Sequence, residues 1–523
     1  MKYKFLAALL AGSAMSFAGP AFAAQDPTPV TEQTEPDTSD ATADAAIANA
    51  QAVDDAQAKI ELLQAQVEAL QASIEQVKAG MAKATPSWKG APVWEDKDAG
   101  FSFKPKGLIQ FDAGYTGFPK GNELRGTVGG LNFGNLGWNS RARRLTIGAD
   151  GTLPGGFRYS AEFNLAQGSV DYEDIWLAYD VKNSPVTVQM GYFYPFSSLE
   201  TMTSSKFTSF MERASLHDAF AYNRRLGVGI LANDKKADSW TFQAGIFNEP
   251  INNGNFTHTG WQASVRGVYS PMLGSTRLHL GANFQHRENT REALGATYRS
   301  RPLTQLTGES FINTAVAAKS DNIAGVEVAA IMKSFHFAGE AQKVWVNAYT
   351  PAEIAAINAE TDSNDIPTGT GYNGNPSFWS AYGEIGYYFT GETRGYKGGK
   401  FDRTKVLHPF NEGGWGALQL NARVDYVELR DRVDSSSSSV AAPFYVNGGK
   451  QIAYQGSLIW NPTDYVRFMA QYGRLDITGG PRASVATLGP PPTLGIFPVG
   501  TATPADKRKY GVDTFAVRAQ VDF

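Results

Sequence analysis

From Phe101 to the end of the chain, hydrophobic and polar residues alternate in short segments separated by glycine, proline, asparagine and aspartate. The last segment is the clearest: one face holds Phe515, Val517, Ala519, Val521 and Phe523, and the other holds Thr514, Ala516, Arg518, Gln520 and Asp522. This two-residue period predicts a β-strand with one apolar and one polar face. A strand between lipid and a water-filled interior needs such a pattern, and a half-buried strand of a soluble sheet can also show it.

The alternation recurs in many earlier segments, and the lengths of the connections between segments help to choose a fold. Short connections such as Ser184-Pro185 contrast with long polar stretches at 287–322, 350–377, 431–449 and 479–509. Short turns at one end and long loops at the other are typical of outer-membrane barrels, and a closed barrel leaves no strand edge unpaired. We therefore predict an all-β fold in which residues 101–523 form a transmembrane antiparallel β-barrel. The strand at 514–523 should seal it against the strand beginning near Phe101.

Before the barrel, the period of the apolar residues changes from two to alternating steps of three and four. These residues are Val53, Ala56, Ile60, Leu63, Val67, Leu70, Ile74, Val77 and Met81. The heptad pattern predicts an N-terminal coiled-coil helix over residues 53–84 that mediates oligomerisation; the alternative is one amphipathic helix lying on another domain. Residues 24–52 are rich in Ala, Thr, Asp and Pro, which predicts a flexible acidic linker. Residues 85–100 form a connector.

The amino terminus and the composition narrow the class of protein further. Residues 1–23 combine a basic start, an apolar stretch and Ala21-Phe22-Ala23, which predicts a secretory signal peptide. No later apolar run approaches the ~20 residues that a transmembrane helix needs.

The chain has no cysteine, which excludes disulfides and thiolate metal sites. Residues 24–100 hold fourteen acidic and five basic residues; with the two lysines of residues 1–23, the net charge of −4 leaves +3 for residues 101–523.

One stretch, Gly191 to Ala214, does not alternate cleanly and concentrates hydroxyl groups beside Lys206 and Arg213. At this stretch the sequence resembles the phosphate-selective porin family, the O and P type. The resemblance covers about residues 88–523 and rests on the shared order of SRARRLTIGADG, F-SSLE-x-x-TSSK-F-x-x-FMERA, VYSPM with TRLHLGANFQHR, YFTGETRGY, GGWGALQLNARVDY and NPTDYVRFMAQYGRLDI.

The resemblance implies a homotrimer of barrels of about sixteen strands in the outer membrane of a Gram-negative bacterium. It also implies passive diffusion of small anions, phosphate or polyphosphate, past a constriction formed by the inward-folded segment 190–214. The positions that match the family's anion-contacting region are Ser204, Ser205, Lys206, Arg213, Asp174, Arg143 and Arg144. Thr201 stands where phosphate-selective members carry a lysine, a departure that puts high-affinity phosphate binding in doubt. Neither the resemblance nor the residues imply a cofactor, a metal or a nucleic-acid partner.

Chemistry alone gives these residues a coherent role. An anion entering a narrow pore loses water, and serine hydroxyls and a guanidinium replace the lost hydrogen bonds. Asp174 can accept a hydrogen bond from a protonated phosphate oxygen, which chloride and sulfate cannot offer at neutral pH. Other arginines would add sites along the path if they face inward: Arg158, Arg224, Arg225, Arg266, Arg423 and Arg518.

Each candidate also has a structural interpretation. Ser204 and Ser205 could cap a short helix beginning at Lys206, Arg213 could brace Glu212, and Asp174 could be a salt-bridge partner. Three near-adjacent bases cannot share one face of a regular strand, so at most two of Arg141, Arg143 and Arg144 should point inward.

Other functions remain as alternatives to a selective anion porin. The nearest is a general or differently selective porin, favoured by interior-parity acids such as Glu162 and Asp425. A structural protein that tethers the envelope, or a barrel enzyme, is less well supported, and no motif places a nucleophilic serine beside a histidine. We therefore expect a channel rather than an enzyme.

Overall fold

The structure is a computed structural model. It describes residues 41–84, 87–88, 90–124, 135–248, 260–289, 295–360, 374–433, 446–484, 495–498 and 500–523. The chain divides into two compact units, Met1–Ala82 and Lys83–Phe523. The predicted signal peptide and the first part of the predicted linker lie outside the described residues. Among the helices that are described, none is both long and apolar enough to cross a membrane.

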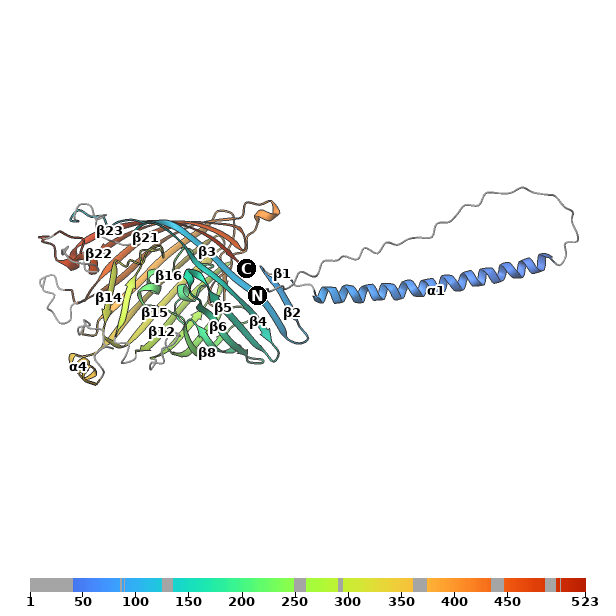
Figure 1. Cartoon of the computed structure of the whole chain (residues 1–523), viewed down its shortest axis with the longest axis horizontal. Coiled ribbons are helices and arrows are strands. Elements are labelled where there is room, and N and C mark those ends of the chain that lie inside the picture. The colour runs from blue at the N-terminus through green and yellow to red at the C-terminus, as the bar shows by residue number, and fades with distance from the viewer. Residues whose placement is uncertain are drawn as a thin grey trace, which may run out of the picture. The chain divides into compact units, whose positions relative to one another are not determined.

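Helix α1 spans Ala41–Ala84, so it begins inside the segment 24–52 for which we expected a flexible linker (Figure 1). Seven of the twelve residues from 41 to 52 are alanine, the residue with the highest helix propensity, which explains the earlier start. The predicted connector, 85–100, holds two short strands, β1 (Ser87–Trp88) and β2 (Pro92–Asp96). Strand β2 pairs with the first strand of the barrel.

The rest of the chain is built on a 19-stranded sheet, of which sixteen strands form a closed antiparallel barrel and three, β1, β2 and β11 (Met272–Leu273), are short additions. The barrel strands are β3 (Phe101–Thr116), β4 (Gly137–Leu153), β5 (Phe157–Asn164), β6 (Asp171–Asp180), β7 (Val186–Phe193), β8 (Arg225–Asn233), β9 (Trp240–Asn248), β10 (Trp261–Tyr269), β12 (Thr276–Glu288), β15 (Ala318–Met332), β16 (Phe335–Ala348), β17 (Ser377–Tyr388), β20 (Ala417–Asp431), β21 (Val446–Thr463), β22 (Val466–Thr478) and β23 (Lys509–Asp522).

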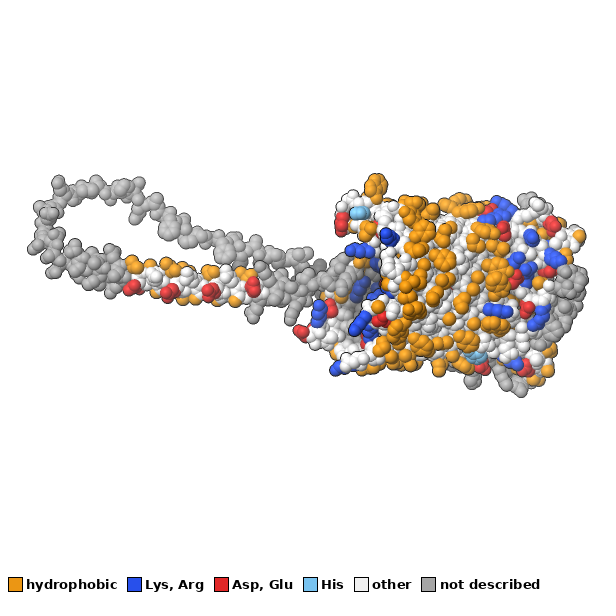
Figure 2. All heavy atoms as spheres, turned by 180° about the vertical axis from the view of Figure 1, so that it is seen from behind, with side chains coloured by type: hydrophobic (Ala, Val, Ile, Leu, Met, Phe, Trp, Pro, Cys, Tyr) orange, Lys and Arg blue, Asp and Glu red, His pale blue; other side chains and the backbone are white. Residues whose placement is uncertain are grey.

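The last strand closes the barrel as the sequence predicts. Strand β23 pairs antiparallel with β3, with Arg518 opposite Asp112 and Gln520 opposite Gln110. Along β23 the apolar residues Phe515 and Val517 are exposed on the outer face, while Arg518 is buried inside. Figure 2 shows the result for one side of the barrel, where hydrophobic side chains cover the middle of the wall and charged side chains gather toward its two ends. The wall thus has the outer surface that lipid requires.

The connections mostly follow the predicted pattern of short turns at one end and long loops at the other, and the largest departure is at the short-turn end. Residues 389–416 connect β17 to β20 at the short-turn end and carry the hairpin β18 (Gly395–Lys397) and β19 (Lys400–Asp402). The sequence did not predict a long connection here, because the Gly-rich sequence of residues 389–416 differs from that of the long polar stretches. The hairpin reaches the barrel interior, where the Arg266 guanidinium donates to the Gly399 carbonyl over 2.7 Å.

Two chain segments fold inward from the long-loop end. One is 194–224, which carries helices α2 (Leu199–Met202) and α3 (Ser215–Ala219); the other is 301–311, between β13 (Ala296–Ser300) and β14 (Ile312–Val316). Both contribute to one hydrophobic cluster inside the barrel, and the cluster also includes residues of the wall. Its fully buried members include Leu199, Phe220, Phe311, Ile312, Phe378, Val427, Leu475 and Val512. Close packing of this kind fixes the two inward segments relative to the wall.

Candidate functional site

Segment 194–224 lies inside the barrel, whereas the resemblance implies an inward fold over 190–214. Residues 190–193 belong to β7, and the inward segment continues to residue 224. Ser198 caps α2, and its hydroxyl accepts from the Thr201 amide at 3.2 Å. No helix begins at Lys206 in this described segment, so the interpretation of Ser204 and Ser205 as caps of such a helix is wrong. Both serines instead line a cavity.

Buried charges hold this segment against the wall. The guanidinium of Arg423 in β20 is fully buried and donates to the carboxylates of Glu200, at 2.9 Å, and Glu384, at 2.5 Å. The Ser215 amide donates to Asp425 at 2.7 Å. Because Glu200 and Ser215 flank residues 201–214, these contacts hold both ends of that stretch.

The second inward segment, 301–311, contacts the first segment and the wall. The amide of Arg301 donates to the Asp218 carboxylate at 2.8 Å, and its guanidinium pairs with the same group at 3.3 Å. The Arg141 guanidinium donates to the Gln305 carbonyl at 2.5 Å. The polar composition of 287–322 predicts an outer loop here, because it gives no sign that residues 301–311 turn inward.

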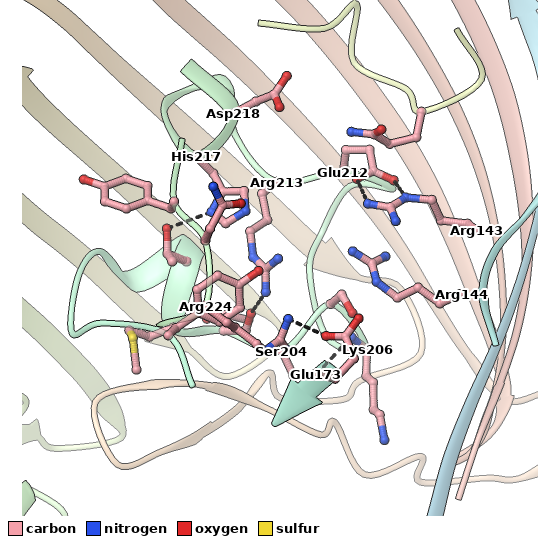
Figure 3. Close-up of a pocket in the computed structure, with 18 of the residues that line it drawn as sticks. Arg143, Arg144, Glu173, Ser204, Lys206, Glu212, Arg213, His217, Asp218 and Arg224 are labelled. Atoms are coloured by element: carbon pink, nitrogen blue, oxygen red, sulfur yellow. Dashed lines mark hydrogen bonds and ion pairs between the residues drawn. The ribbon is translucent and has the colours of Figure 1, made fainter. Parts of the chain in front are cut away.

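Between these segments and the wall lies a cavity of about 410 Å³. It is lined by β4, β6, both inward segments and Lys400 of β19. Figure 3 shows Arg144 on the wall and Arg213 on the inward segment pointing toward the same space. The basic residues of the lining are Arg143, Arg144, Lys206, Arg213, Arg224, Arg301 and Lys400; the acidic ones are Glu162, Glu173, Asp174, Glu212 and Asp218.

These charges are not evenly paired. Three of the cations hold carboxylates of the lining: Arg143 pairs with Glu212 at 2.8 Å, Arg224 with Glu173 and Asp174, and Arg301 with Asp218. Within the described part of the chain, no carboxylate lies within 4.0 Å of the other four, which are Arg144, Lys206, Arg213 and Lys400. The cavity therefore offers excess positive charge beside many hydroxyl groups.

A β-bulge in β4 explains how the arginine cluster faces the interior. Gln110 of β3 pairs with Arg144, but the next residue, Phe111, pairs with Ala142, so Arg143 is the extra residue. A bulge shifts the alternation by one position and re-aims side chains. Arg143 and Arg144 both line the cavity, and Arg141 reaches Gln305, which also lines it. The prediction that at most two of the three face inward is thus wrong.

The other predicted residues also meet at the cavity. Ser204, Ser205, Lys206, Arg213 and Asp174 all line it. Arg213 is held by the carbonyls of Glu200, at 3.0 Å, and Thr203, at 2.8 Å, and not by Glu212. Asp174 accepts from Arg224 at 2.8 Å, so the salt-bridge interpretation of Asp174 holds. Of the arginines proposed as further sites, Arg266, Arg423 and Arg518 face inward but are fully buried, which removes them from the path of an ion.

Three further residues line the cavity that no sequence pattern predicts to be there: Tyr194, His217 and Lys400. The Tyr194 ring lies 4.4 Å from the Arg224 guanidinium and 5.4 Å from that of Arg213, so it holds two like charges near each other. The His217 ring hydrogen-bonds the Thr201 hydroxyl at 3.1 Å. Burial, followed by the charge of Arg213, lowers the pKa of His217 well below its usual value. His217 therefore stays neutral near pH 7 and adds no charge to the cavity.

Comparison with known proteins identifies relatives of the chain. The family model "Phosphate-selective porin O and P" matches residues 121–481. An uncharacterized protein of Caulobacter vibrioides is 36% identical over 404 residues, covering 75% of this chain and 72% of that protein. Porin O of Pseudomonas aeruginosa is 27% identical over 406 residues, covering 72% and 83%. The solved anion-selective porin from Comamonas acidovorans superimposes with a TM-score of 0.43 at 10% identity, over 81% of this chain and 100% of that one.

Proposed function

The chain belongs to the phosphate-selective porin O and P family and is an outer-membrane porin, and we propose that its channel conducts small anions, with phosphate as the preferred class. The observation that supports the proposal is the set of four cations around one cavity that have no described carboxylate within 4.0 Å: Arg144, Lys206, Arg213 and Lys400. Their excess positive charge attracts anions and repels cations.

The cavity also has groups that replace an anion's water. The hydroxyls of Ser204 and Ser205 and the guanidiniums of Arg144 and Arg213 are all donors. A guanidinium is planar and presents several donors at once, which suits a tetrahedral oxyanion better than a spherical ion. Thr201, which stands where an ammonium would bind an anion tightly, is buried and its hydroxyl is bonded to His217, so binding is weak enough to permit release.

Asp174 provides the discrimination between phosphate and other anions in this proposal. One of its oxygens accepts from Arg224, which leaves the second oxygen to accept a hydrogen bond from a protonated phosphate. Chloride and sulfate have no such proton near neutral pH. Its partner Arg224, which also pairs with Glu173, reduces the repulsion that the carboxylate would otherwise exert on an anion.

Planar-bilayer recording tests the proposal. We expect a reversal potential of anion sign in a salt gradient and a chloride current that added phosphate blocks. Replacing Arg213 with Ala should weaken the block several-fold because it removes a donor and a charge from the cavity. The matched control is Arg158→Ala, which removes an arginine whose partner is Asp180 and which does not line the cavity.

Cation preference in this recording would overturn the proposal in favour of a general porin, a function that the five carboxylates of the cavity would then support. A phosphate block unchanged by Arg213→Ala would exclude Arg213 as a main contact. If Arg158→Ala weakened the block equally, the effect would come from total charge and not from the cavity.

We propose, in addition, that the α1 helices of neighbouring copies associate as a coiled coil within a trimer. The apolar stripe of α1 is half or more exposed along its described side chains, from 50% at Ile74 to 60% at Leu70. Such a stripe gains stability when another helix covers it. β-Branched Val53 and Ile60 at a positions favour two strands, whereas the family resemblance implies three copies, so the oligomer size is the quantity to measure.

Replacing Ile60, Val67 and Ile74 with Gln should weaken the oligomer, because it puts polar groups into the stripe. The control variant replaces Glu61, Glu68 and Glu75 with Gln, which changes the same number of side chains outside the stripe. Sedimentation in detergent should show smaller particles for the first variant only. Equal particle size in both variants would contradict a role for the stripe, and a dimer in the unmodified protein would contradict the trimer.

A further inference from the structure

We infer that Glu212 sets the strength of the anion site by permanently neutralising Arg143, one of the two adjacent arginines that the β4 bulge sends into the cavity. The inference rests on the proposed anion channel, and it assigns Glu212 a role in selectivity that is opposite to that of its basic neighbours. Glu212 and Arg143 both line the cavity.

The contact between these two side chains is bidentate. The Arg143 guanidinium donates to the two carboxylate oxygens of Glu212 over 2.8 and 2.9 Å. The two side chains are 17% and 14% exposed, so water screens the pair little. Parallel hydrogen bonds of this kind fix both groups and leave little of the positive charge of Arg143 for a passing ion.

Glu212 also accepts from Arg518 at 2.9 Å, but this second cation already has its own partner. Asp112 binds the Arg518 guanidinium through two bonds of 2.6 and 2.7 Å. The four charged groups therefore balance as two cations and two anions. Without Glu212, the uncompensated charge would appear on the Arg143 side, because Arg518 would keep Asp112.

The neutralisation persists at mildly acidic pH. Burial acts to raise the pKa of Glu212, but Arg143, followed by Arg518, outweighs it and holds the pKa well below its usual value. The carboxylate thus stays ionised under mildly acidic conditions.

Arg144, the next residue in the chain, is an arginine of the same cavity without a carboxylate partner, as Arg143 would be without Glu212. Its guanidinium donates to the Gln110 side chain at 2.8 Å, and no described carboxylate lies within 4.0 Å of it. Two uncompensated guanidiniums at adjacent positions would hold an oxyanion tightly. A conducting site must release its ion, so neutralising one of the pair favours passage over trapping.

The test is Glu212→Gln, which removes the charge but keeps a side chain that can accept from Arg143. We expect the anion-to-cation permeability ratio to rise roughly tenfold, because one unit charge about 6 Å from an ion in water changes the permeability of the anion and of the cation about threefold each, in opposite directions. Phosphate should also block the chloride current for longer.

The double variant Arg143→Gln with Glu212→Gln should return the ratio to that of the unmodified protein. The control Asp180→Asn removes the partner of Arg158, outside the cavity, and should leave the ratio unchanged.

A ratio that stays constant or falls in Glu212→Gln would overturn the inference. So would a double variant as strongly altered as the single one, since that result would mean that the pair only holds the segment in place. Failure of the proposed function is distinguishable: the unmodified channel would then prefer cations, while Glu212→Gln would still shift the ratio toward anions. Thermal unfolding of each variant in detergent identifies any preparation that is misfolded and therefore excluded from the comparison.

Discussion

Replacing Arg144 with Glu is expected to lower the anion-to-cation permeability ratio about a hundredfold. The change removes one positive charge from the cavity and adds one negative charge. In water, a unit charge about 6 Å from an ion contributes ~0.7 kcal/mol, so two charges raise the energy of an anion by ~1.4 kcal/mol and lower that of a cation by the same amount. The ratio therefore changes by ~2.8 kcal/mol, which is about a hundredfold. Arg144 has this effect because no described carboxylate within 4.0 Å compensates it. The measurement is the reversal potential in a potassium chloride gradient.

The control for this prediction is Lys235→Glu, which makes the same change in total charge at an exposed turn. Lys235 does not line the cavity, and salt screens charges that far from the ion path. We expect its ratio to match that of the unmodified protein. An unchanged ratio in Arg144→Glu, or an equal drop in both variants, would show that selectivity is set elsewhere in the barrel.

Replacing Arg423 with Ala should destabilise the barrel by about 3–5 kcal/mol and enlarge the pore. The change leaves Glu200 and Glu384 buried side by side without the cation that holds both. Removing one partner of a buried charge network has a cost of this size because the remaining charges stay out of water. Glu200 belongs to the inward segment and Glu384 to the wall, so their repulsion should push the constriction away from the wall. We expect a lower unfolding temperature in detergent and a higher single-channel conductance.

A triple variant separates the charge effect from lost packing. Arg423→Met with Glu200→Gln and Glu384→Gln fills a similar volume without any charge. This variant should recover most of the unfolding temperature and the original conductance. If Arg423→Ala unfolded at the same temperature as the unmodified protein, the network would not be what holds the segment.

The alternation of residues was sufficient to predict the wall of this protein, because lipid imposes one rule on every strand. Strand β23 shows this well: Phe515 and Val517 face outward and Arg518 inward, as their parity requires. The same rule failed in β4, where one extra residue, Arg143, reverses the parity of its neighbours. A bulge is fixed by pairing with the neighbouring strand, and nothing in a single strand's sequence announces it.

The interior was harder to predict than the wall. The segment 194–224 could be found because its hydroxyl-rich sequence interrupts the alternation, and the resemblance then pointed to Ser204, Ser205 and Arg213. The sequence did not predict that segment 301–311 and Lys400 line the cavity. Both belong to connections that fold inward, and their positions depend on partners distant in sequence, such as Asp218. Helix α1 begins earlier than the predicted residue 53. The stretch before that residue has few apolar residues, which is typical of a flexible linker, but it is rich in alanine, which favours the helix.

The Arg518 side chain ties the order of assembly to the completion of the channel. It pairs with Asp112, 406 positions away on the first barrel strand, and it donates to the Met211 carbonyl and the Glu212 carboxylate of the inward segment. Contacts so distant in sequence form late, after the last strand has arrived. Closing the ring therefore also completes the hydrogen bonds that hold the inward segment at Met211 and Glu212. A barrel that lacks its final strand is not only open at its seam but also lacks these contacts to its own interior.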